Sequence, residues 1–190
     1  MLETLLELDK ELFLYLNGLG NASWDNFWQF VTHSKLTSIP LYLLLLILSY
    51  KQLGLKNTVL LVVAVVLLIT VSDQLSNFFK YGVARLRPCH DPDVSPFMRL
   101  VKSYCGGKYG YFSAHASNSF AIAAFFGIVL RSRFKNFGIF LFIWAAFIAY
   151  SRVYIGVHFP LDIITGAVIG SLFGWVFAKL FIFASRKFLL

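Results

Sequence analysis

Five long apolar stretches run through this chain and constrain its fold more than any other feature. They cover residues 36–50, 57–79, 115–130, 137–150 and 160–184. A helix that crosses a bilayer needs about 20 mostly apolar residues, so most of these stretches reach or approach that length. Charged residues make up 14% of the chain, against about 25% in soluble domains. Because lipid leaves backbone polar groups no partner outside the segment, we expect an all-α polytopic membrane bundle with five spanning helices.

The N-terminal segment differs from these stretches because acidic residues interrupt it. Over residues 3–17 leucines recur at helical spacing with acids opposite, which is typical of a helix lying along the bilayer surface. Trp24, Phe27 and Trp28 continue with the aromatic residues of a membrane interface. No basic region precedes a clean apolar core, so we do not expect a cleavable signal. We expect one domain over residues 1–190, with an interfacial segment at 1–34 and the bundle at 35–190. A sixth, partly spanning helix is the alternative.

Three short polar clusters interrupt the apolar sequence. They are Lys80-x6-Arg87-Pro88, Phe112-Ser113-Ala114-His115 and Ser151-Arg152-x5-His158-x3-Asp162. Together they supply cations for a phosphoryl group, two imidazoles and a carboxylate, which are the parts that phosphate-ester hydrolysis needs. Their order and spacing resemble the type 2 phosphatidic acid phosphatase superfamily, whose pattern is KxxxxxxRP, PSGH and SRxxxxxHxxxD. The middle cluster departs from it, with Phe112 in place of proline and Ala114 in place of glycine.

The resemblance implies a role for each residue of the pattern. His158 would attack phosphorus and form a phosphohistidine, and Asp162, four residues later on one helix face, would orient the ring. His115 would protonate the departing lipid oxygen and then activate water. Phosphate binding is expected of Lys80, Arg87, Ser113, Ala114 and Arg152. With three cations and a histidine nucleophile present, no cofactor and no divalent metal is expected.

Several other polar residues flank these motifs. We expect four basic residues to face solvent or lipid, with at most one touching a substrate head group: Arg85, Arg99, Lys102 and Lys108. Asp73 shares a helix face with Lys80, so we expect it to support a cation of the motifs. Small residues at every fourth position predict close packing of the last span against a neighbour. They are Gly166, Gly170, Gly174 and Ala178.

We expect the active-site loops to cover residues 80–115 and 151–162. Cys89 and Cys105 both lie in the first of these, in the loop that joins the first two motifs. An oxidising compartment would allow them to pair, so we expect a disulfide. Two unpaired thiols are one alternative. A metal site built from Cys89, His90, Asp91 and Asp93 is another, although the spacing does not match a structural zinc motif.

Five spans would bring all three motifs to the side of the N-terminus. The short loops on the other side carry Lys and Arg without acids, which weakly favours that side as cytoplasmic. The active site would then face the periplasm or exterior of a bacterial inner (plasma) membrane, as the resemblance also implies. The net charge of +8 fits anionic lipid head groups and phosphorylated substrates, and not nucleic acid, because no soluble module carries it.

The function expected from these features is hydrolysis of a terminal phosphate or diphosphate on a membrane lipid. Undecaprenyl diphosphate is the first expectation because the chain is compact and has almost no outer domain. A phosphate of lipid A, phosphatidylglycerol phosphate and phosphatidic acid are alternatives. A non-catalytic anion or lipid transporter would use the cations but would need neither histidine nor Asp162, so the complete set favours an enzyme. The partners expected are the lipid substrate and membrane lipids, and the oligomeric state stays open.

Overall fold

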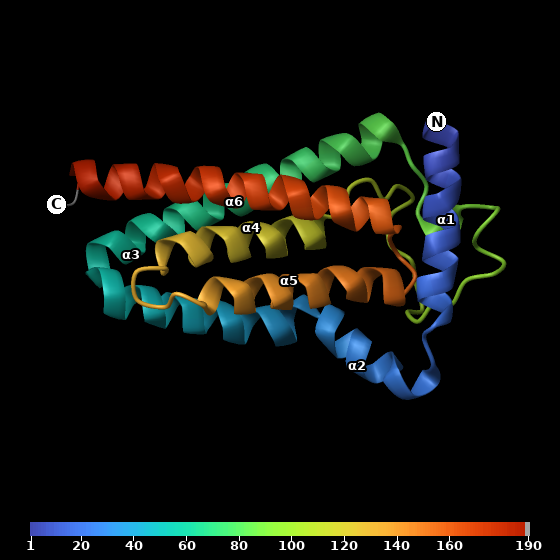
Figure 1. The fold of residues 1–190 in the computed structure, drawn as a ribbon, viewed down its shortest axis with the longest axis horizontal. Coiled ribbons are helices and arrows are strands. Elements are labelled where there is room, and N and C mark those ends of the chain that lie inside the picture. The colour runs from blue at the N-terminus through green and yellow to red at the C-terminus, as the bar shows by residue number, and fades with distance from the viewer. Residues whose placement is uncertain (189–190) are drawn as a thin grey trace.

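The computed structural model describes residues 1–188, apart from the side chains of residues 34–36, and over this range it is a bundle of helices (Figure 1). The α-helices are α1 (Leu2–Gly18), α2 (Ala22–Thr32), α3 (Ser34–Val83), α4 (Ala114–Val129), α5 (Phe137–Tyr154) and α6 (Pro160–Phe188), with a short 3-10 turn η1 (Pro88–His90) after α3. The predicted all-α membrane bundle is confirmed.

Helix α3 consists of two arms that fold back on each other at Gly54. This residue has a φ of 75° inside the 50-residue element, a conformation that a side chain would disfavour. Figure 1 shows the reversal at the end of the bundle opposite α1. By length and apolarity the candidate spans are Thr37–Val83, Phe137–Tyr154 and Pro160–Phe188, with Ala114–Val129 as a shorter apolar helix. With the fold at Gly54, α3 supplies two of the five predicted spans.

Helix α4 lies in the middle of the bundle and packs closely on α6. A methyl group on Gly170 would lie 2.0 Å from the carbonyl oxygen of Ser117, and one on Gly174 would lie 2.3 Å from that of Ala121. The predicted close packing of the small-residue stripe is therefore confirmed, because no side chain fits at these two positions. Farther along the same contact, the Ser113 N–H donates to the Asp162 carbonyl oxygen at 3.0 Å. The packing thus fixes the start of α4 against the start of α6.

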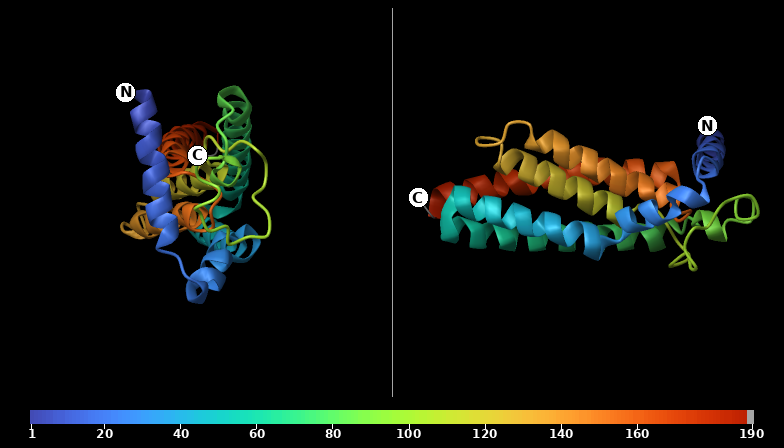
Figure 2. Two further views of the ribbon diagram at one scale, coloured as in Figure 1. Left: turned by 90° about the vertical axis from the view of Figure 1, so that its right-hand side faces the viewer. Right: turned by 90° about the horizontal axis from the view of Figure 1, so that it is seen from below.

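Helix α1 crosses the end of the bundle where the three motifs meet (Figures 1 and 2). Its outward face exposes Leu5, Leu8 and Leu12, as expected for a helix lying on a bilayer. On its inner face, Asn17 is fully buried and its amide donates to the backbone oxygens of Val153 and Tyr154. Helix α2 has 11 residues, too few to span a bilayer. Both helices therefore cover the end of the bundle, and neither forms a sixth span.

Candidate active site

His158 and Asp162 form a buried pair where α5 gives way to α6. His158 is 2% exposed, and its Nδ1 lies 3.4 Å from Oδ2 of Asp162, which is wholly buried. The same carboxylate oxygen accepts the Phe159 N–H at 3.0 Å and so caps the start of α6. A proton on Nδ1 shared with Asp162 leaves a lone pair on Nε2. The ring is thus oriented with a single nitrogen free to react.

The free nitrogen of His158 faces Arg87. The distance from Nε2 to Nη1 of Arg87 is 3.4 Å, and the guanidinium is held by the backbone oxygens of Tyr109 and Val157, both at 3.2 Å. Burial, and then the positive charges of Arg87 and Arg152, lower the pKa of His158 well below its usual value. The imidazole is therefore neutral at physiological pH. A neutral, oriented imidazole beside a cation is suited to attack an anionic phosphoryl group.

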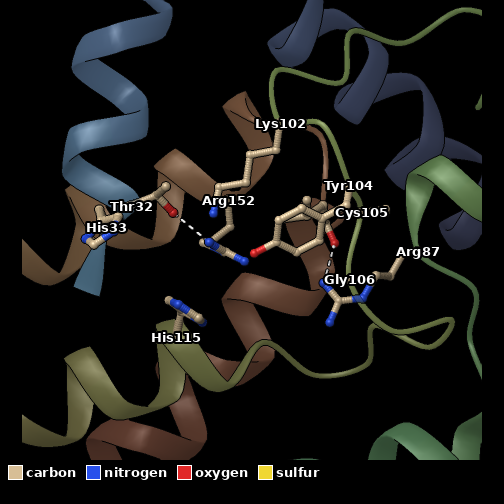
Figure 3. Close-up of a pocket in the computed structure, with 10 residues that line it drawn as sticks. Thr32, His33, Arg87, Lys102, Tyr104, Cys105, Gly106, His115 and Arg152 are labelled. Atoms are coloured by element: carbon tan, nitrogen blue, oxygen red, sulfur yellow. Dashed lines mark hydrogen bonds between the residues drawn. The ribbon is translucent and has the colours of Figure 1, made fainter. Parts of the chain in front are cut away.

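A cavity of about 350 Å³ is lined by Arg87, Lys102 and Arg152, and Arg87 separates it from His158, which does not itself line it. We call it the basic cavity (Figure 3). Burial, reinforced by the nearby Arg152, lowers the pKa of Lys102. Arg152 is 7% exposed and donates to the Thr32 hydroxyl at 2.6 Å, while its Nε has no hydrogen-bond partner among the described residues. A buried donor without a partner costs about 1–3 kcal/mol. An anionic ligand would satisfy it.

His115 points into the basic cavity from the first turn of α4, as Figure 3 shows. Ser113, just before it, is the N-cap of α4, and its side chain accepts the Ala116 N–H at 3.4 Å. That oxygen is fully buried and does not line the basic cavity. Ala114 lines a second, neighbouring cavity. Lys80, half-buried in the last turn of α3, does not line the basic cavity but lies close enough to interact electrostatically with Arg87 and Arg152.

Comparison with known proteins decides the family. The model of the PAP2 superfamily matches residues 57–186, more than half of the chain. The chain belongs to the PAP2 superfamily. It is 35% identical over 189 residues to a lipid A 4'-phosphatase of Porphyromonas gingivalis, covering 99% of this chain and 79% of that protein. An undecaprenyl-diphosphatase of Sulfolobus acidocaldarius is 32% identical over 164 residues, covering 85% of this chain and 72% of that protein.

The fold of a solved PAP2 structure agrees with this assignment. The transmembrane PAP2 type phosphatidylglycerolphosphate phosphatase from Bacillus subtilis superposes with a TM-score of 0.74 at 19% identity, covering 97% of this chain and 89% of that one. From the family match and the curated relatives, this protein is a multi-pass bacterial membrane lipid phosphatase of the PAP2 superfamily.

In this PAP2 phosphatase Arg85 is tied to the buried pair, so the expectation that it faces solvent or lipid was wrong. Its Nη1 donates to Oδ1 of Asp162 at 2.9 Å and its Nη2 to Oδ2 of Asp9 at 2.5 Å. The other oxygen of Asp9 accepts the Leu161 N–H in the first turn of α6 at 2.9 Å. Arg85 occupies an unspecified position of the first motif, so the motif gave no signal for it. The link joins the N-terminal helix to the carboxylate that orients His158.

The expectation allowed one of the four flanking basic residues to reach the substrate head group, and the structure places one of them at the cavity. Lys102 is the one basic residue of the four that lines the basic cavity, whereas Arg99 pairs with Asp25 of α2 at 2.9 Å. Thr32 and His33 at the end of α2 line the cavity as well. Nothing in their spacing marks them, because they come from a helix outside the three motifs.

Asp73 does not pair with a cation of the motifs. It accepts a hydrogen bond from the Asn118 amide at 2.8 Å. Its hydrogen-bond partner is thus an amide of α4, while Asp73 lies close enough to Lys80 to interact with that motif cation electrostatically.

The two cysteines are joined in the structure. Cys89 and Cys105 form a disulfide with their Cα atoms 6.3 Å apart, inside the usual range for such a bond. His90 lies beside them. Asp91 and Asp93, the remaining members of the alternative metal site, instead form ion pairs with Lys10 of α1 at 3.2 and 2.7 Å. The carboxylates are thus engaged with α1, which leaves the metal alternative without its oxygen ligands.

Proposed function

We propose that this PAP2 phosphatase removes a phosphate from a lipid A-type glycolipid. The observation that carries the proposal is the 35% identity to a lipid A 4'-phosphatase over 99% of this chain. The undecaprenyl-diphosphatase matches at lower identity and over 85% of the chain. The lipid A alternative therefore has better support than undecaprenyl diphosphate, which was the first expectation from the sequence.

In the proposed mechanism His158 is the nucleophile. As its Nε2 forms a bond to phosphorus, the bond from phosphorus to the lipid oxygen breaks and the electron pair stays on that oxygen. Arg87 and Arg152 bind the phosphoryl oxygens, and the unpartnered Nε of Arg152 is one donor that the substrate would satisfy. Asp162 stabilises the positive charge that develops on the imidazole.

His115 serves as the acid and then as the base. The negative phosphate beside the ring favours its protonated form, which then gives its proton to the departing lipid oxygen. In the second half, a water attacks the phosphohistidine and His115 takes its proton. Inorganic phosphate leaves, and His158 returns to its neutral form.

The test is phosphate release by the purified protein in detergent, with lipid A, undecaprenyl diphosphate and phosphatidic acid compared. We expect the highest kcat/KM with lipid A. We expect His158→Ala to lose activity and Arg152→Ala to lose about 10²–10³-fold, the usual cost of one donor to a transition state. His90→Ala is the matched control because His90 is exposed in the loop. Wild-type turnover in His158→Ala would reject the assignment of His158 as nucleophile. A preference for phosphatidic acid would reject lipid A as the substrate.

We further propose that the site faces the periplasm or exterior. Helix α6 ends at the opposite end of the bundle from the basic cavity, so a fluorescent protein fused to the C-terminus would lie in the cytoplasm. Fluorescence of that fusion in whole cells is the expected result, because such a reporter matures poorly outside the cytoplasm. A dark fusion that remains enzymatically active would reverse the orientation.

A further inference from the structure

A second cavity of about 250 Å³ adjoins the basic cavity, deeper in the bundle. Five of its polar side chains come from two helices, with Ser38, Tyr42 and Asp73 on the two arms of α3 and Asn118 and Ser119 on α4. A polar group at this depth in a membrane bundle needs a partner. We call this space the polar cavity.

The polar cavity lies on the side of the basic cavity away from the nucleophile. Thr32 and His115 line both cavities. Arg87 lines the basic cavity but not the polar cavity, and it lies against His158. In Figure 3, Thr32 and His115 stand at one side of the basic cavity and Arg87 at the other. An in-line displacement puts the leaving oxygen opposite the nucleophile. The leaving group would therefore pass His115 and enter the polar cavity.

Asn118 gives the polar cavity an acceptor without a partner. Its NH₂ must face Asp73, since a carboxylate only accepts, and that bond measures 2.8 Å. The amide oxygen is then left enclosed, with no hydrogen bond among the described residues. Leaving such a group unpaired costs about 1–3 kcal/mol. A ligand with a hydroxyl or amide N–H would recover this cost, and a prenyl chain would not.

An apolar groove continues from the polar cavity. It has a volume of about 180 Å³, shares Tyr42 with the polar cavity, and runs between the arms of α3 past Leu45, Leu61 and Ile122. The three spaces therefore follow one another as cationic, polar and apolar. A glycolipid carries phosphate, sugar and acyl chain in the same order. At about 250 Å³ the polar cavity is many times larger than the space one water needs, which leaves room for a sugar ring.

We propose that the polar cavity binds the sugar of the leaving group through Asn118, whose amide is oriented by Asp73, and so selects phosphorylated glycolipids over phosphorylated prenyl chains. This inference rests on the proposed function, because it needs a phosphate ester of a sugar as substrate. Asn118 contacts the substrate in this assignment, whereas Asp73 is a positioning residue that fixes the direction of the Asn118 amide.

The test compares kcat/KM for lipid A and for undecaprenyl phosphate in the same mixed micelles. Asn118→Leu removes the amide with little change in volume, and we expect it to lower the value for lipid A about tenfold or more, since tenfold corresponds to about 1.4 kcal/mol. The value for undecaprenyl phosphate should fall less than about threefold. Asn57→Leu is the matched control, because Asn57 is hydrogen-bonded to Leu53 and Ser185, far from both cavities.

Tyr42→Phe is the second variant and removes only a hydroxyl from the cavity wall, so it keeps the test valid if Asn118→Leu does not fold. We expect it to lower the lipid A value about threefold or more. If both variants leave the ratio of kcat/KM for lipid A to kcat/KM for undecaprenyl phosphate unchanged, the polar cavity is not a sugar site. The proposed function would still stand. A wild type that prefers undecaprenyl phosphate, with variants that still lower only the lipid A value, would overturn the proposed function and keep the sugar site. No wild-type hydrolysis of lipid A would overturn both.

Discussion

Arg85 links the buried carboxylates of Asp9 and Asp162. Replacing Arg85 or Asp9 tests whether the N-terminal helix takes part in catalysis. The side chains of Arg85, Asp9 and Asp162 are 14%, 2% and 0% exposed. Removing one partner of a buried ion pair costs about 3–5 kcal/mol. For a chain of this length about 1 kcal/mol shifts Tm by about 2–4 °C, so Arg85→Gln should lower Tm by roughly 6–20 °C.

Asp9→Asn is the sharper variant because it removes the charge and keeps an oxygen for the Leu161 N–H. We expect kcat to fall about 10–100-fold, by analogy with residues that orient metal-binding histidines through one hydrogen bond. KM should stay within about twofold, since neither Asp9 nor Arg85 lines the basic cavity. Burial raises the pKa of Asp9, although the hydrogen bond from Arg85 opposes the shift. As the pH falls, wild-type Asp9 takes up a proton above its usual range, so the difference from Asp9→Asn should shrink.

The measurements are steady-state rates against pH and thermal unfolding in detergent. Asp93→Asn is the matched control, because Asp93 is paired with the neighbouring Lys10 at 2.7 Å but is 74% exposed. Exposed pairs contribute about 0–1 kcal/mol, so this variant should change neither Tm nor kcat appreciably. If Asp9→Asn kept the wild-type kcat while its Tm fell, α1 would only support the fold, and the positioning argument would be refuted.

Four further predictions follow from the site and the packing. Intact-mass analysis of protein from its native envelope should show Cys89 and Cys105 unalkylated until a reductant is added. Closing this loop with a disulfide stabilises the folded protein by about 3 kcal/mol. Two alkylated thiols without reductant would contradict the pairing. Activity should survive exhaustive chelation with EDTA. Vanadate, which adopts the five-coordinate geometry of the transition state, should inhibit the enzyme. A loss of activity on chelation that is reversed by added zinc or magnesium would reject the mechanism. Gly170→Ala should lower Tm because its methyl group would meet a backbone oxygen at 2.0 Å, whereas Gly82→Ala, with open space around it, should not. Because the pKa of His158 is lowered, kcat/KM should not fall between about pH 7.5 and 6 through protonation of this ring, as it would for an ordinary histidine with a pKa of about 6.5.

The sequence predicted the bundle and the meeting of the motifs because both depend on local patterns. Apolar length predicts spans, and spans of known number bring alternate loops to one side. The four-residue spacing of His158 and Asp162 predicts one helix face, and the structure brings these side chains within 3.4 Å. The stripe around Gly170 also follows from spacing alone, since small residues at every fourth position allow two helix backbones to approach.

The contribution of the N-terminal segment was not predictable from spacing. Asp9 meets Arg85 across 76 residues and Asn17 meets Tyr154 across 137, and no motif links either pair. An amphipathic helix with leucines on one face predicts a position on the membrane, but it does not tell which polar residue is buried by the bundle. The polar cavity was missed for the same reason, because its side chains come from helices whose relative rotation no single sequence pattern determines.

The link between Asp9 and Leu161 also bears on how the protein is made. The two residues are 152 positions apart, so Asp9 leaves the ribosome long before its partner. At about 5–20 residues per second, this delay is roughly 8–30 seconds. During that time α6 does not exist for α1 to pack against, and Asp162, the carboxylate that contacts His158, has not yet been made. The phosphatase therefore acquires its active site in one late step of synthesis, when the final segment enters the membrane, and the growing chain cannot consume lipid phosphates before the bundle around it is complete.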